Sequence, residues 1–180
     1  TRRSSDLTLK AAHDSQIYDL ENKIAVGFPQ EIQRCKELVV NLTADAATVQ
    51  AHTHKDAEGK DIFSMQLMEK TYTEKEPAGK ALLGLLGVAL DTEKPVPIGN
   101  YKGLALQVSH AVFGNVFSVK LVGAGTYTAE LGNDVLGNLT RISNLANGIE
   151  PNIEKIKAKQ ARLEQQLASA EEEVKRPFPQ

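Results

Sequence analysis

The hydrophobic pattern is strongest between Asn138 and Arg176, where apolar residues recur at alternating intervals of three and four positions. This spacing lines them up on one side of an α-helix, and such a heptad seam has to pack against a partner helix. We therefore predict one long helix over Asn138–Arg176. Gly148 and Pro151 lie inside it and favour a bend there. The seam consists of Ile142, Ala146, Ile149, Ile153, Ile156, Leu163, Leu167, Ala170 and Val174, with Gln160 at its one polar position.

A second seam of the same kind predicts a helix over Gln30–Ala51. Its apolar positions are Ile32, Cys35, Val39, Leu42, Ala46 and Val49. Because the chain leaves through one of these helices and returns through the other, we expect the two to pack antiparallel. A further helix is predicted from Asp6 onward. Pro29 follows Gly27 and cannot donate the helical hydrogen bond, so we expect a break or sharp kink there.

Between the two seams the pattern changes to the strand period of two. Ile62–Thr73 reads as a hairpin with its turn at Met68-Glu69. Thr73 followed by Glu76 has the spacing of a capping box, which predicts a helix over 74–90. This predicted helix contains Gly79, Gly84 and Gly87, and these glycines indicate that it approaches a sheet closely.

Asp91–Pro97 contains two prolines and reads as a linker. Three alternating runs follow, separated by short glycine-bearing turns, and they predict strands over Tyr101–Val108, Val116–Leu121 and Tyr127–Leu131. The predicted fold is α+β, a small antiparallel β-meander with one packed helix, mounted on a long antiparallel helical stalk. The expected ranges are 1–56 for the N-terminal helices, 57–135 for the sheet and its helix, and 136–180 for the C-terminal helix, all in one structural unit.

Composition narrows the functional classes. The net charge is −2 and the pI is about 6.1, which gives no overall electrostatic case for nucleic acid or membrane. No apolar run approaches the roughly 20 residues that span a bilayer. Cys35 is the only cysteine, so no disulfide can form within the chain, and we expect a cytoplasmic location. The chain starts at Thr1 without an initiator Met, and its last helix pattern runs almost to the end. We therefore expect a fragment of a larger protein.

No motif indicates catalysis. The sequence lacks a phosphate-binding loop, and Gly123-Ala124-Gly125 lies between two predicted strands, as a turn would. His52, His54 and Asp56 could contact a metal, but no further ligands recur at matching spacing, which favours a polar loop leaving a helix. We therefore predict no catalytic, cofactor-binding or metal-binding residues and no cofactor.

One electrostatic feature stands out in the long C-terminal helix. Lys155, Lys159 and Arg162, the basic stripe, share a helical face at spacings of four and three. Such a stripe could contact phosphate groups, or it could solvate a coiled coil and pair with acidic residues of a partner helix.

Four stretches of the chain carry a resemblance: Phe63–Leu83, Ile98–Leu104, Tyr127–Ile142 and Ala170–Gln180. Together they resemble the C-terminal region of very large proteins of phages and conjugative elements. Those proteins join an adenine-specific DNA methylase to a Swi/Snf-type helicase and are often described as antirestriction or helicase-related. The methylase and helicase motifs of that family are absent here, so the resemblance transfers no catalytic residue.

The resemblance implies a non-catalytic accessory domain of a mobile-element DNA helicase/methylase. Such a domain would position the upstream helicase and methylase modules or contact DNA, weakly and without sequence specificity. The alternative is a structural protein–protein interaction or dimerisation module, a homodimer through the stalk, with no role on DNA. Salt-dependent DNA binding would favour the first, and dimerisation without DNA binding the second.

Overall fold

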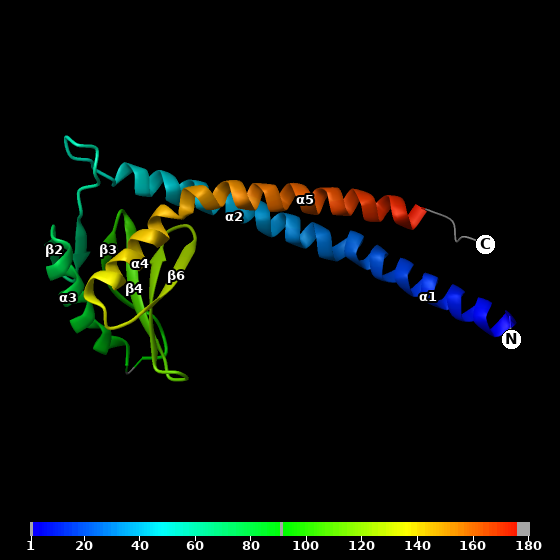
Figure 1. Ribbon diagram of the computed structural model, residues 1–180, viewed down its shortest axis with the longest axis horizontal. Helices are drawn as coiled ribbons and strands as arrows, with labels where there is room; N and C mark the ends of the chain where they lie inside the picture. Colours follow the sequence, from blue (N-terminus) through cyan, green and yellow to red (C-terminus); the bar gives the residue numbers. More distant parts are fainter. Residues whose placement is uncertain (1, 91, 176–180) are drawn as a thin grey trace. The chain divides into compact units, whose positions relative to one another are not determined.

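The structure is a computed structural model that describes residues 2–90 and 92–175, with side chains from residue 8 onward. It has an α+β fold, as predicted, with long helices and an antiparallel sheet of six strands, one more than predicted (Figure 1). The chain divides into two compact units. Residues 1–39 and 154–180 form the helical unit, and residues 40–153 form the sheet unit. The sheet unit therefore includes the second half of one predicted stalk helix and the beginning of the other.

The N-terminal helices run without a break. α1 (Arg2–Asn22) continues through a π-helical turn, η1 (Lys23–Gly27), into α2 (Phe28–Ala51). The amide of Phe28 donates to the carbonyl of Lys23, five residues earlier. This wider turn relaxes the spacing that would otherwise press the ring of Pro29 against the preceding turn. The predicted break at Gly27–Pro29 is therefore wrong, because one π-helical turn accommodates the proline.

In the helical unit the two seams pack on each other. Ile32 and Cys35 of α2 form a buried cluster with Leu163 of α5 (Ile149–Lys175). Phe28, Ile156 and Leu167 pack against this cluster. Within this unit α2 and α5 run in opposite directions (Figure 1). The antiparallel pairing is thus confirmed here, and Cys35, only 2% exposed, is a core residue. Arg176 lies outside the described residues.

The sheet unit is built on strands in the order β2-β1-β3-β4-β5-β6, all neighbours antiparallel. Their bounds are Met65–Leu67 for β1, Lys70–Tyr72 for β2, Val96–Tyr101 for β3, Leu104–Ala111 for β4, Val116–Val122 for β5 and Thr126–Leu131 for β6. The hairpin with its turn at Met68-Glu69 is confirmed, as are the last two predicted strands.

β3 lies partly in the predicted linker. The pairing of β3 with β4 shifts register between Pro97 and Gly99, and this bulge accommodates a proline that cannot donate to the ladder. The predicted strand over Tyr101–Val108 is also wrong in its first residues. Lys102 and Gly103 have φ values of 49° and 81° and form the tight turn between β3 and β4.

α3 (Lys75–Leu85) begins later than the capping box predicts. Its N-cap is Glu74, whose side chain makes no capping hydrogen bond, and a 3-10 turn, η2 (Leu86–Ala89), ends it. The Thr73 capping box is therefore wrong. A Cβ at Gly79 would lie 2.5 Å from the carbonyl oxygen of Val135, so this glycine permits close packing on α4, a helix rather than a sheet.

The long C-terminal helix is interrupted where a bend was expected. α4 (Val135–Asn147) is capped by Gly148, and α5 begins at Ile149. α4 packs on α3 and on the last two strands, so it helps to cover the sheet (Figure 1). The core of this unit lies between one sheet face and the helices. It includes Met65, Leu67, Leu82, Leu104, Leu106, Val108, Val119, Leu121, Leu139 and Ile142, each at most 4% exposed.

Candidate functional site

The basic stripe lies on the solvent side of α5. Lys155, Lys159 and Arg162 are all exposed, whereas Ile156 and Leu163 beside them turn toward α2. None of the three forms an ion pair with any described residue, while Lys157 pairs with Glu154 at 3.8 Å. The structure therefore leaves three cations of one helix face free to meet an external anion.

A fourth cation comes from another helix. Arg162 and Lys23 both line a shallow depression of about 390 Å³ in the helical unit, together with Leu20, Phe28 and Glu173. Sequence analysis did not identify Lys23, because no spacing rule connects positions on different helices. The carboxylate of Glu173 also lines the depression, so the electrostatic potential there is not uniformly positive.

The two units differ in charge balance. The helical unit contains twelve basic and eleven acidic residues, and the sheet unit contains nine and twelve. Residues 155–162 include four basic residues and no acidic one. By these charge counts, a polyanion would be attracted to this segment of α5, whereas the excess of three acidic residues in the sheet unit would disfavour it.

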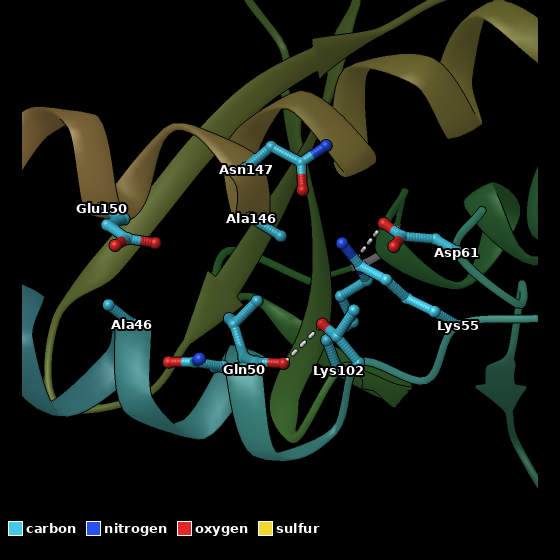
Figure 2. A pocket seen from close by; sticks show the side chains of 10 residues that line it. Ala46, Gln50, Lys55, Asp61, Lys102, Ala146, Asn147 and Glu150 are labelled. Atoms are coloured by element: carbon cyan, nitrogen blue, oxygen red, sulfur yellow. Dashed lines mark hydrogen bonds and ion pairs between the residues drawn. The ribbon is translucent and has the colours of Figure 1, made fainter. Parts of the chain in front are cut away.

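The sheet unit contains a polar pocket of about 500 Å³ (Figure 2). The Lys102 side chain is only 9% exposed, and its Nζ lies 3.3 Å from Oδ2 of Asp61. The same ammonium lies 5.8 Å from the centre of the Tyr101 ring. The other lining residues come from α2, the following loop and the junction of α4 with α5: Ala46, Val49, Gln50, Thr53, Lys55, Ala146, Asn147 and Glu150.

The charges of this pocket are already balanced. Asp61 neutralises Lys102, and the more open Lys55 and Glu150 are of opposite sign. The Thr53 hydroxyl is engaged, because it donates to the carbonyl of Val49 at 2.6 Å. The pocket could hold a polar molecule, but its lining does not place a nucleophile beside a general base.

The histidine-rich segment after α2 is committed to local hydrogen bonds. His52 Nδ1 donates to the carbonyl of Thr48 at 2.8 Å. Asp56 Oδ1 accepts from the amides of Glu58 and Lys60 at 2.9 and 3.0 Å. Within the part of the chain that the structure describes, no three histidine, cysteine or acidic side chains converge as metal ligands.

A buried carboxylate that sequence analysis missed connects α2 to the sheet. Asp45 is 2% exposed and accepts hydrogen bonds from the amides of Ala124 and Gly125 at 2.7 and 2.8 Å and from the Tyr127 hydroxyl at 2.6 Å. A Cβ at Gly123 would lie 2.3 Å from this carboxylate, so the turn needs glycine there. The cluster is saturated internally, which indicates a structural role.

Burial raises the pKa of Tyr127 well above its ordinary value, and the hydrogen bond to Asp45 and the negative charge of that residue raise it further. The neutral phenol is therefore strongly favoured in the folded state. Glycines flanking a turn, with a tyrosine two residues later, were the only sequence signal for this cluster. The hydrophobic periodicity of the Gln30–Ala51 helix predicts that Asp45 lies on the surface beside the heptad seam.

Among residues 2–90 and 92–175, no helix combines the length and apolarity needed to cross a membrane. No protein-family model, curated protein or solved structure matches the chain.

Proposed function

We propose that the chain is a non-catalytic accessory domain of a mobile-element DNA helicase/methylase, and that it contacts DNA through α5. The observation that carries this proposal is the basic stripe. Lys155, Lys159 and Arg162 are exposed on one helix face and make no ion pair among the described residues. The resemblance of Phe63–Leu83 and Tyr127–Ile142 to those proteins supplies the biological setting.

Binding through the stripe would be weak and without sequence specificity. Three or four cations can neutralise about as many phosphates, so the logarithm of affinity should fall with the logarithm of salt concentration with a slope of about −3. None of the stripe residues is aromatic, so the stripe offers no stacking platform for single-stranded bases. We therefore expect the stripe to bind duplex DNA.

Fluorescence anisotropy with a short labelled duplex tests the proposal. Reversing Lys155, Lys159 and Arg162 to Glu should abolish binding at low salt and leave the circular dichroism spectrum unchanged, since these positions lie outside the seam. The matched control reverses Lys60, Lys80 and Lys94, three exposed lysines of the sheet unit, and so changes net charge equally.

If binding survives reversal of the stripe, or if both triple variants lose it equally, α5 is not the contact surface. If the unmodified chain shows no binding at low salt, the DNA role itself is refuted.

The second candidate, a protein-interaction module without a DNA role, is favoured by a different observation. Phe113 and Val112 are 99% and 85% exposed in the loop between β4 and β5. These two adjacent side chains form an apolar patch at the tip of the loop, and exposed apolar patches can mark protein-interaction sites. Analytical ultracentrifugation of the chain without DNA distinguishes this candidate function from the DNA-binding one. Concentration-dependent association lost in Phe113→Ser would support it, and a monomer at all concentrations would refute self-association.

A further inference from the structure

A second pocket of the sheet unit differs from the polar one in having an apolar floor. It is a depression of about 320 Å³ beside α4, lined by Phe63, Lys75, Tyr101, Leu136, Leu139, Thr140, Ser143 and Asn144. Tyr101 and Leu139 are buried and form its floor, and Phe63 and Ser143 are half-buried. The remaining four are exposed and surround the opening. This volume lies in the range of small-molecule sites.

The floor contains a hydroxyl that the protein does not satisfy. Tyr101 is 95% buried, at 5% exposure, and its hydroxyl makes no hydrogen bond with any described residue. No fully enclosed side-chain polar atom of the described residues lacks a partner, so this hydroxyl must retain some access to solvent. The pocket that Tyr101 lines offers that access. Water can satisfy a hydroxyl with such access, and a polar group of a bound ligand can replace that water.

The two aromatic rings are arranged as one wall. The centroids of Phe63 and Tyr101 are 6.5 Å apart, with a 39° angle between the planes. Leu139 contributes apolar surface at the floor and Leu136 at the rim, where it is 52% exposed. A flat apolar group fits between such surfaces better than a polar chain does.

The rim supplies one positive charge. Lys75 forms no ion pair with any described residue, whereas the neighbouring Glu76 is taken by Lys80 at 3.2 Å. The Ser143 hydroxyl accepts from Asn147 Nδ2 at 3.4 Å and keeps its own proton to donate. The polar groups around the opening therefore favour an anion with hydrogen-bond acceptors.

We propose that this pocket binds a small aromatic carboxylate. The ring lies between the aromatic wall and the leucines, a polar ring substituent bonds the Tyr101 hydroxyl, and the carboxylate faces Lys75 and the Ser143 hydroxyl. This site is independent of the basic stripe, which lies in the other unit. A ligand of about a dozen heavy atoms would have a dissociation constant of about 0.1–1 mM.

The probe is indole-3-acetate, titrated into the full chain labelled with ¹⁵N and followed by two-dimensional NMR. Its ring N–H can donate to the Tyr101 hydroxyl, and its carboxylate can reach the rim. Indole-3-ethanol has the same ring without the charge. We expect saturating shifts centred on Phe63, Tyr101 and Ser143, and weaker binding of the alcohol by about threefold to tenfold.

Variants assign the roles of the residues. Lys75→Gln should weaken the acid about threefold to tenfold and leave the alcohol unchanged, while Lys80→Gln, an equal charge change on the same helix, should alter neither. Tyr101→Phe should weaken both probes. Because Lys75 is exposed, its variant remains informative even if Tyr101→Phe unfolds.

Absence of saturating shifts up to about 10 mM acid, ten times the weakest expected dissociation constant, would overturn the site. Equal binding of acid and alcohol, with no effect of Lys75→Gln, would overturn the carboxylate class.

Discussion

Replacing Asp45 by Ala should destabilise the sheet unit by about 3–5 kcal/mol. The substitution removes a carboxylate that accepts three hydrogen bonds and leaves the amides of Ala124 and Gly125 and the hydroxyl of Tyr127 without their partner. A hydrogen bond to a charged group contributes about 1.5–3 kcal/mol, and a buried donor left without a partner costs about 1–3 kcal/mol. Against a total stability of about 5–15 kcal/mol, this loss is large.

Two milder variants show whether the loss comes from these bonds. Asp45→Asn keeps the shape, but its NH₂ group cannot accept from an amide, so we expect a cost of about 2–3 kcal/mol. Tyr127→Phe removes one bond and should cost about 1–2 kcal/mol. Combining Tyr127→Phe with Asp45→Ala should cost less than the sum of the two, because both remove the same 2.6 Å contact.

Urea denaturation followed by circular dichroism measures these losses. Ala44 and Ala47 are exposed neighbours of Asp45 on α2 and offer a control position. Ala47→Ser, which adds a hydroxyl at an exposed position, should change stability by less than about 0.5 kcal/mol. A cost below about 1 kcal/mol for Asp45→Ala would refute the reasoning that the turn between β5 and β6 depends on this carboxylate.

Three further results are expected. The pKa of Tyr127 is higher in the folded than in the unfolded state, so its contribution to folding stability is complete below pH 10. Above pH 10 this contribution is lost by at most about 1.4 kcal/mol per pH unit. The stability difference between the unmodified chain and Tyr127→Phe should therefore shrink above pH 10 and stay constant below it. Leu163→Asp should lower stability by at least about 3 kcal/mol and exposed Glu172→Lys by less than about 0.5 kcal/mol, and equal melting shifts would mean that the seam is misassigned. Thr73→Ala should be nearly silent, since α3 begins after Glu74, and a loss near 1 kcal/mol would restore the capping box.

The parts of the fold that were predicted correctly depend on hydrophobic periodicity. Ile32, Cys35 and Leu163 are buried where the heptad spacing places them, and the alternation in β5 and β6 marks real strands. Periodicity succeeds because burial of one face is the largest free-energy term for such elements.

Rules for single residues were less reliable. Pro29 was expected to break a helix, and Pro97 was expected to lie in a linker. In both places the backbone absorbs the proline with one irregular turn or bulge. At Pro97 this costs less than losing the pairing of β3 with β4. A local preference of a few kcal/mol is decisive only where no tertiary packing opposes it.

The candidate sites could not be predicted because they depend on register and not on pattern. β1 pairs with β3 so that Gln66 lies opposite Asn100, and this register brings Phe63 near Tyr101 although 38 positions separate them in the sequence. The strand predicted to start at Tyr101 would have placed that ring at the beginning of the strand that contains Leu104, whereas the turn at Lys102-Gly103 places it at the end of the preceding strand, β3. A shift of one residue in either pairing would turn a strand's side chains to the opposite face, so the aromatic wall depends on a bulge and a turn that no periodicity specifies.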